Sequence, residues 1–178
     1  MTIYFGDGST MTAGVSLTYA HWFYTSGGTV TISTGSNGTH IPISHVDYQS
    51  GITVSTSNNN WTHSTTGKYV LTIRYRQNSG GDVWTCWGIT KGGNSDAVGV
   101  SARTGSENAH NEAYDIFYTV DSTSATYQVQ GWCGSSTKTV KNPDAQGKPA
   151  WSNYDTLCGE SNSTSGRQMD VIIQKIGS

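Results

Sequence analysis

Charge is the scarcest property of this sequence, since only 12% of its 178 residues are Asp, Glu, Lys or Arg. Ten basic residues oppose twelve acidic ones, and no basic run occurs beyond Arg74 and Arg76. A nucleic-acid binder needs a concentrated positive patch to neutralise phosphates, so we expect no nucleic acid as a partner. The two arginines fit the outward side of one alternating strand.

Long apolar runs are also missing. The sequence contains no stretch of 18 apolar residues, and its first residues show neither the basic segment nor the apolar segment of a signal peptide. We therefore expect no membrane insertion and no secretion signal, with synthesis in the cytoplasm of the producing cell.

Cysteine is rare and forms no metal-binding pattern. The three cysteines show no CxxC spacing, which argues against a zinc site. Cys86 lies between Trp84 and Trp87 in an apolar segment, which favours a buried free thiol. A bridge between Cys133 and Cys158 is the alternative for the other two, although a protein made without a signal peptide stays in a reducing compartment.

Helical periodicity is absent, whereas glycine, serine, threonine and asparagine are abundant. Twenty-two glycines punctuate short runs rich in Val, Ile, Thr and Tyr, a composition that favours strands and turns. We expect an all-β chain of about eight to ten strands, folded as a two-sheet sandwich or jelly roll. The expected strands cover residues 29–33, 46–54, 68–76, 83–90, 97–101, 114–120, 125–132 and 169–176.

The remaining segments carry weaker signals. Residues 15–24 fit either an extended segment or a short helical turn. Residues 103–110 are polar and predict a loop, and the segment from Cys133 to Gly166 predicts a long one of the kind that is often functional.

The stretch around Gly51 organises the expected sandwich. We expect a short strand, a turn at Gly51 and a second short strand over residues 46–54, and Tyr48, Ile52 and Val54 share a parity that would point them to one face. Residues 68–76 alternate apolar and polar side chains, which predicts one buried face, and the apolar run at 169–176 predicts a central strand.

These residues resemble the signature of C1q-like and tumour-necrosis-factor-like jelly rolls. The resemblance rests on Asp47-Tyr48, Gly51-Ile52 and Gly67-Lys68-Tyr69, with Val171 to Ile173 similar to the last buried strand of that family. It covers residues 29–178 and implies a jelly roll that forms homotrimers through aromatic residues near a threefold axis. The reversed order of Asp47 and Tyr48, the long loop after Cys133 and the glycine-rich turn at 91–95 depart from the family.

The first residues, Thr2 to Met11, resemble the N-terminal motif of structural proteins of marine tailed phages, cyanophages included. That resemblance implies a fibre, a receptor-binding tip or a capsid decoration. Fourteen residues cannot build a core alone, so this strand needs another sheet or another copy. We expect a docking segment at residues 1–14 and a β-sandwich domain at 15–178. The docking residues would be Ile3, Tyr4, Phe5 and Asp7.

No catalytic motif is evident. The five histidines show no HxH or HExxH spacing, no Gly-x-Ser-x-Gly elbow occurs, and the aspartates are spread singly. We expect no catalytic residue, no cofactor and no metal, with hydrogen-bonded or surface histidines. One alternative stays open, in which three copies each supply a histidine to a metal on the symmetry axis.

Aromatic residues are the most informative set, at 11% of the chain. Trp61, Trp132, Trp151 and Tyr154 lie in or beside expected loops. The last three of these are candidate receptor contacts, because exposed Trp and Tyr can stack on sugars or anchor a protein partner. Others fit the core or the trimer interface: Tyr48, Tyr69, Tyr75, Trp84, Phe117 and Tyr127.

Together these features predict a non-enzymatic protein of the phage virion surface. It would be a homotrimer docked to other virion proteins by its N-terminus, and it would act in host attachment as a fibre component. Multivalent contact with a host glycan or protein would supply affinity, with the segment from Cys133 to Gly166 as the distal loop. A capsid decoration protein and a stand-alone carbohydrate-binding sandwich are the alternatives.

Overall fold

The computed structural model describes residues 3–4, 10–11, 17–25, 30–32, 34, 38–78, 83–93, 97–105, 110–134, 138–141 and 167–178. Its regular elements within those ranges are fifteen β strands, which confirms the all-β prediction. No helix in the described part of the chain is long and apolar enough to cross a membrane.

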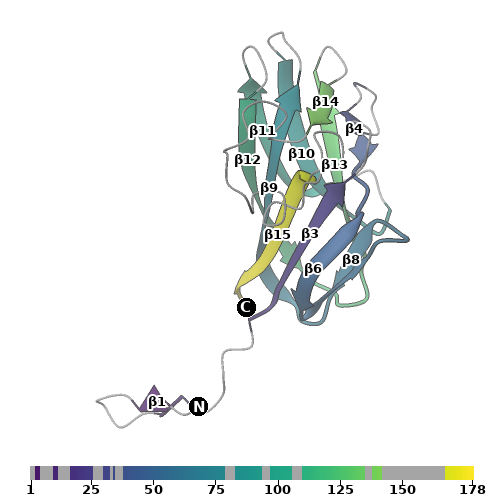
Figure 1. Cartoon of the computed structure of the whole chain (residues 1–178). Coiled ribbons are helices and arrows are strands. Elements are labelled where there is room, and N and C mark those ends of the chain that lie inside the picture. Colours follow the sequence, from purple (N-terminus) through teal and green to yellow (C-terminus); the bar gives the residue numbers. More distant parts are fainter. Residues whose placement is uncertain are drawn as a thin grey trace.

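The larger sheet has seven strands, all paired antiparallel (Figure 1). Strand β9 has β12 along one side and both β14 and β15 along the other. Beyond these lie β4 next to β14 and β3 next to β15, with β6 at the far edge. The strands are β3 (Tyr19–Thr25), β4 (Val30–Ile32), β6 (His45–Ser50), β9 (Gly67–Asn78), β12 (His110–Val120), β14 (Lys138–Lys141) and β15 (Arg167–Gly177).

The second sheet has six strands in the order β11-β10-β13-β8-β7, with β5 also paired to β13. Two further short strands, β1 (Ile3–Tyr4) and β2 (Thr10–Met11), pair only with each other, and Figure 1 draws β1 apart from the sandwich. The strands of the six-stranded sheet are β5 (Thr39–His40), β7 (Ile52–Ser55), β8 (Asn60–His63), β10 (Val83–Lys91), β11 (Ala97–Gly105) and β13 (Tyr127–Cys133).

The core lies between the two sheets and follows the period of two that strands impose. In β9 every second residue from Tyr69 to Tyr75 is buried, and β12 and β15 show the same alternation. Trp61, Trp87 and Tyr127 fill the opposite side from the six-stranded sheet. Each such side chain stabilises the fold by about 1.5–3 kcal/mol relative to exposure. The expected central position of the last strand is confirmed, because β15 lies between β9 and β3.

The chain changes sheet at both edges of the sandwich. Gly51, with a φ of 68°, turns the chain from β6 in one sheet to β7 in the other. A Cβ on Gly51 would lie 3.0 Å from Thr18, so the turn has both a left-handed backbone and little space. At the other edge β11 and β12 belong to different sheets.

This change of sheet overturns one prediction. Tyr48 does not share a face with Ile52 and Val54: its side chain is half exposed, while the other two are buried. Parity holds only within one strand of one sheet, and the turn at Gly51 breaks it.

Three other expectations need correction. Trp61 was expected near a loop, yet it is fully buried in β8 opposite Tyr127, because the strand begins directly after the polar turn. The polar residues 103–105 extend β11, and residue 110 begins β12, because pairing with β10 and β9 satisfies their backbone groups. Strand β14 lies inside the segment expected to be a loop and pairs with β4 and β9. Within the segment 15–24, for which a strand and a helical turn were both open, residues 19–24 are extended in β3, and residues 15 and 16 lie outside the described residues.

Candidate assembly face

The outward side chains of the seven-stranded sheet form rows that cross its strands. The first row runs from Phe117 in β12 through Val70 in β9 and Gln174 in β15 to Tyr19 in β3, and each residue pairs with the next. Phe117 is 66% exposed although it lies in the middle of β12. This row on the outward side of the seven-stranded sheet is therefore largely apolar, whereas mainly polar side chains are expected where a sheet faces only water.

The next row is mixed, because it begins at Asp115, which pairs with Thr72. Ile172 pairs with Thr72 on one side and His21 on the other, and Tyr48 lies opposite His21 at the far edge. The ring of Tyr48 is 50% exposed and meets Tyr19 edge-on with centroids 5.2 Å apart. We call the outward positions of these two rows the assembly face.

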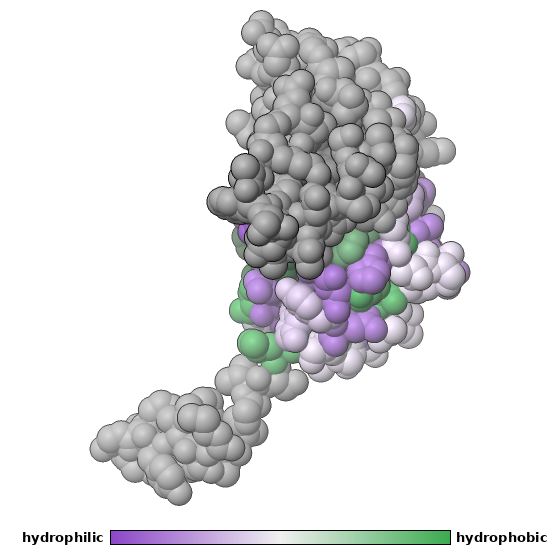
Figure 2. All heavy atoms as spheres, viewed as in Figure 1, coloured by the Kyte–Doolittle hydropathy of each residue, from purple (hydrophilic) through white to green (hydrophobic). Residues whose placement is uncertain are grey.

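An open groove of about 460 Å³ lies where the assembly face meets β11. Its lining includes Phe117, Ile176 and Val98, all exposed, and Lys68 is its one charged residue. Figure 2 shows hydrophobic residues among hydrophilic ones on the described surface. Exposed apolar side chains that gather around a groove, as Phe117, Ile176 and Val98 do, are typical of an interaction site.

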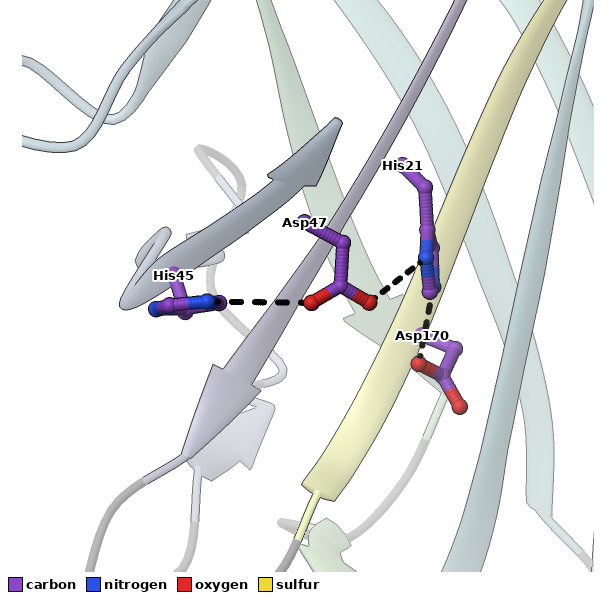
Figure 3. Close-up of polar contacts among 4 residues, drawn as sticks. All are labelled: His21, His45, Asp47 and Asp170. Carbon is purple, nitrogen blue, oxygen red and sulfur yellow. Dashed lines mark hydrogen bonds and ion pairs between the residues drawn. The ribbon is translucent and has the colours of Figure 1, made fainter. Parts of the chain in front are cut away.

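A polar cluster centred on His21 overlaps the second row on the same side of the sheet (Figure 3). The Nδ1 atom of His21 lies 2.9 Å from Asp47 Oδ2, and its Nε2 atom lies 3.1 Å from Asp170 Oδ1. His45 Nε2 lies 3.6 Å from the other oxygen of Asp47. His21 is largely buried, so the cluster ties β6, β3 and β15 together across the sheet.

A β-bulge aims Asp47 at His21. The register pairs Tyr48 with His21 and Val46 with Trp22, so Asp47 is an extra residue opposite β3. Such a bulge re-aims the side chain of the inserted residue and bends the strand. The sequence alone could not reveal this site, because His21 and Asp170 are 149 residues apart.

The two ring nitrogens of His21 each face a carboxylate. Neutral imidazole has one N–H and can donate to only one of the two carboxylates, whereas the imidazolium form can donate to both. With both nitrogens facing carboxylates, neither is available to take a proton from a nucleophile. Within the described residues, no group of His, Cys, Asp or Glu could hold a metal ion.

A second histidine is buried in the core, where sequence patterns did not single it out. His63 is 2% exposed and accepts at Nε2 a hydrogen bond of 3.1 Å from Trp61 Nε1–H. The hydroxyl of Tyr118 lies 3.1 Å from the same nitrogen. Burial lowers the pKa of His63 to about 4, so the ring is neutral at neutral pH. The alternation Trp61-x-His63 in one short strand was the available signal.

The aromatic residues assigned to core or interface separate into two groups. Tyr69, Tyr75 and Tyr127 are buried between the sheets, whereas Tyr48 and Phe117 lie on the assembly face. Trp84 lies in β10, and Trp132 lies in β13 near its end. Ile3 and Tyr4 form β1. Phe5, Asp7, Trp151, Tyr154 and Cys158 lie outside the described residues.

Two cysteines lie in strands. Cys86 in β10 is partly buried, and burial raises the pKa of its thiol, as suits the free thiol that we expected. The Sγ atom of Cys133 lies 3.1 Å from the carbonyl oxygen of Ile32, to which the thiol can donate. The Cys133–Cys158 alternative stays a prediction, because Cys158 is not described.

Comparison with solved structures identifies the fold. The chain is similar to a structure titled Eiger TNF from S. frugiperda, with a TM-score of 0.54 and 10% identity, over 92% of this chain and 94% of that one. The sandwich is therefore a TNF-like jelly roll, as the sequence predicted, and at this identity the match shows the fold alone. A scan of protein-family models and a search of curated sequences find no match to this chain.

Proposed function

We propose that the chain is a non-enzymatic surface protein of a phage virion that self-associates as a homotrimer through its assembly face. The observation that supports this most is the exposure of Phe117 (66%) beside Ile176 (54%) in one apolar groove. Burying two such side chains in an interface is worth about 1.5–3 kcal/mol each, which favours association.

The number of copies is inferred from the fold. The resemblance to C1q-like and TNF-like jelly rolls implies a trimer, and the TNF-like fold is consistent with it. In a threefold ring each copy offers two different surfaces, one to each neighbour. The groove beside β11 and the row from Phe117 to Tyr19 provide two adjoining apolar surfaces of this kind.

The virion setting is inferred from the N-terminal resemblance. Residues 3–4 and 10–11 pair as a small sheet of their own, which suits a segment that docks elsewhere. We infer that Ile3, Tyr4, Phe5 and Asp7 dock the protein to the particle and that the trimer acts in host attachment. Removal of residues 1–14 should prevent incorporation into virions, and incorporation of the shortened chain would refute the docking role. Antibody labelling on the tail supports attachment, whereas labelling over the head favours decoration.

Self-association is tested with Phe117→Asp, which places a charge in the apolar row. The wild-type protein should sediment as three copies, and the variant as one copy with an unchanged circular dichroism spectrum. Thr53→Asp is the matched control, because it adds the same charge at an exposed position of the other sheet. A monomeric wild-type protein, or a Phe117→Asp variant that still forms the same oligomer, would refute the proposal.

A further inference from the structure

The ring of Trp132 lies across the outward surface of the six-stranded sheet. Its neighbours in β13 at alternate positions, Gly131 and Cys133, face the core, so Trp132 faces away from it. A Cβ on Gly88 would lie 2.8 Å from Cζ3 of the indole, and one on Gly38 would clash with Cε2. The indole therefore occupies the space that side chains at these two glycines would need.

The two glycines come from the two sides of β13. Gly88 lies in β10, which pairs with β13 along one edge, and Gly38 immediately precedes β5, which pairs along the other. The ring thus spans three neighbouring backbone segments and rests on main chain. A tryptophan held in this way loses little conformational entropy when a ligand binds. Trp132 is partly buried, and part of its surface stays accessible.

The groups around the ring are polar and uncharged. Gln130 points to the same side of the sheet, and its amide Nε2 lies 2.8 Å from His40 Nε2. Its Oε1 atom is buried and has no hydrogen-bond partner in the described part of the chain. Cys86 lies opposite Trp132 in β10, and the exposed Val100 lies opposite Gly88. None of these neighbours is Asp, Glu, Lys or Arg.

We infer that Trp132 is the stacking platform of a glycan-binding site that takes a neutral pyranose. The C–H face of a pyranose is flat and apolar and packs on an aromatic ring, while its hydroxyl groups can both donate and accept hydrogen bonds. A hydroxyl at the ring edge can exchange a hydrogen bond with the exposed imidazole of His40, which contacts Gln130.

Other ligand classes fit this surface less well. A nucleic-acid base would bring phosphates, for which the named neighbours offer no cation. A protein partner needs roughly 800 Å² on each side, far more than one partly buried indole with a few neighbours supplies. The inference rests on the proposed attachment function for its biological setting, and it specifies the ligand class of that function.

The test uses the purified full-length chain with nitrogen-15 in its six tryptophans. Cellohexaose is titrated in while the indole N–H signals are recorded, with sorbitol as an open-chain polyol that has hydroxyls but no ring. The Trp132 signal should shift with cellohexaose and not with sorbitol. Affinity should fall at least about tenfold in Trp132→Ala and less in Trp132→Phe, because the first variant removes the stacking ring and the second keeps a smaller one.

Two controls separate this inference from others. Phe117→Asp should retain the sugar-induced shift per chain, so a failure of trimer assembly does not count against the platform. Trp151→Ala, which removes another sequence-based candidate, should bind as the wild type does. The inference is overturned if cellohexaose leaves the Trp132 signal unmoved, if sorbitol shifts it equally, or if Trp132→Ala binds with unchanged affinity.

Discussion

Acid should destabilise this fold through one buried histidine. His63 is packed against the rings of Tyr69, Tyr118 and Tyr127, with the Tyr69 centroid 4.2 Å away. Because Trp61 can only donate, its N–H fixes Nε2 of His63 as an acceptor in the neutral ring. Protonating Nε2 of His63 would place its N–H opposite the N–H of Trp61, so that two hydrogen-bond donors face each other inside the core.

The magnitude follows from the pKa. Burial lowers the pKa of His63 from 6.5 to about 4, a difference of about 2.5 units. At 1.36 kcal/mol per unit this amounts to about 3 kcal/mol. Between these two values the unfolded chain binds the proton and the folded chain does not, so the free energy of unfolding falls as the pH falls through this window. Below about pH 4 both states are protonated, and this histidine adds no further loss.

Urea unfolding at one protein concentration, repeated from pH 7.5 to pH 4, measures the effect. His63→Gln keeps an acceptor for Trp61 but does not titrate. Between pH 7.5 and pH 4 the free energy of unfolding of this variant should therefore fall by about 3 kcal/mol less than that of the wild type. His45→Gln is the control: its imidazole is 59% exposed, and the variant should follow the wild-type curve more closely.

Two results would refute this reasoning. One is an equal loss of stability in wild type and His63→Gln, which would show that His63 does not titrate differently in the two states. The other is a proton NMR titration in which His63 titrates near 6.5. That outcome would mean that the three tyrosine rings stabilise the imidazolium enough to offset its burial.

Two further changes test the turn at the start of β9 and the polar cluster. Gly67→Ala should lower the free energy of unfolding by about 1–3 kcal/mol, because φ is 138° and the new Cβ would meet the Gly177 carbonyl oxygen. Gly92→Ala, where no atom lies within 4 Å, should cost less, and equal losses would contradict the steric argument. His21→Leu should cost at least about 0.5–1.5 kcal/mol and speed amide exchange in β6, since it removes hydrogen bonds between His21 and the two carboxylates; unchanged exchange in β6 would show that the polar cluster does not hold this strand.

The strands could be predicted from sequence wherever one face is buried. Residues 68–76 alternate apolar and polar side chains, and β9 shows the burial pattern that this alternation predicts. The prediction that Tyr48 shares a face with Ile52 and Val54 failed, because alternation does not reveal that the chain passes from one sheet to the other at Gly51. It also missed Trp61 as a core residue, because β8 has four residues and follows a polar turn.

The sites could be predicted less well than the strands. The polar cluster depends on the strand order β6-β3-β15 and on the bulge at Asp47, and neither has a local sequence signal. Phe117 was assigned to core or interface, and only the structure distinguishes them: Tyr118 next to it is buried, whereas Phe117 faces outward. For Trp132 the aromatic residue was visible, but the two glycines that support it are 44 and 94 positions away in the chain.

The two proposed surfaces are compatible because they lie on opposite outer faces of one sandwich, whose sheets are about 10 Å apart. If three copies associate through the seven-stranded sheet, the six-stranded sheet of each copy faces away from the interface. Three equivalent Trp132 platforms are then displayed at once. A single stacked sugar contributes only a few kcal/mol, which corresponds to weak binding. A repeated surface glycan could engage several platforms together and raise the avidity by about 10² or more. Assembly through Phe117 is therefore what would make a weak site at Trp132 sufficient for attachment.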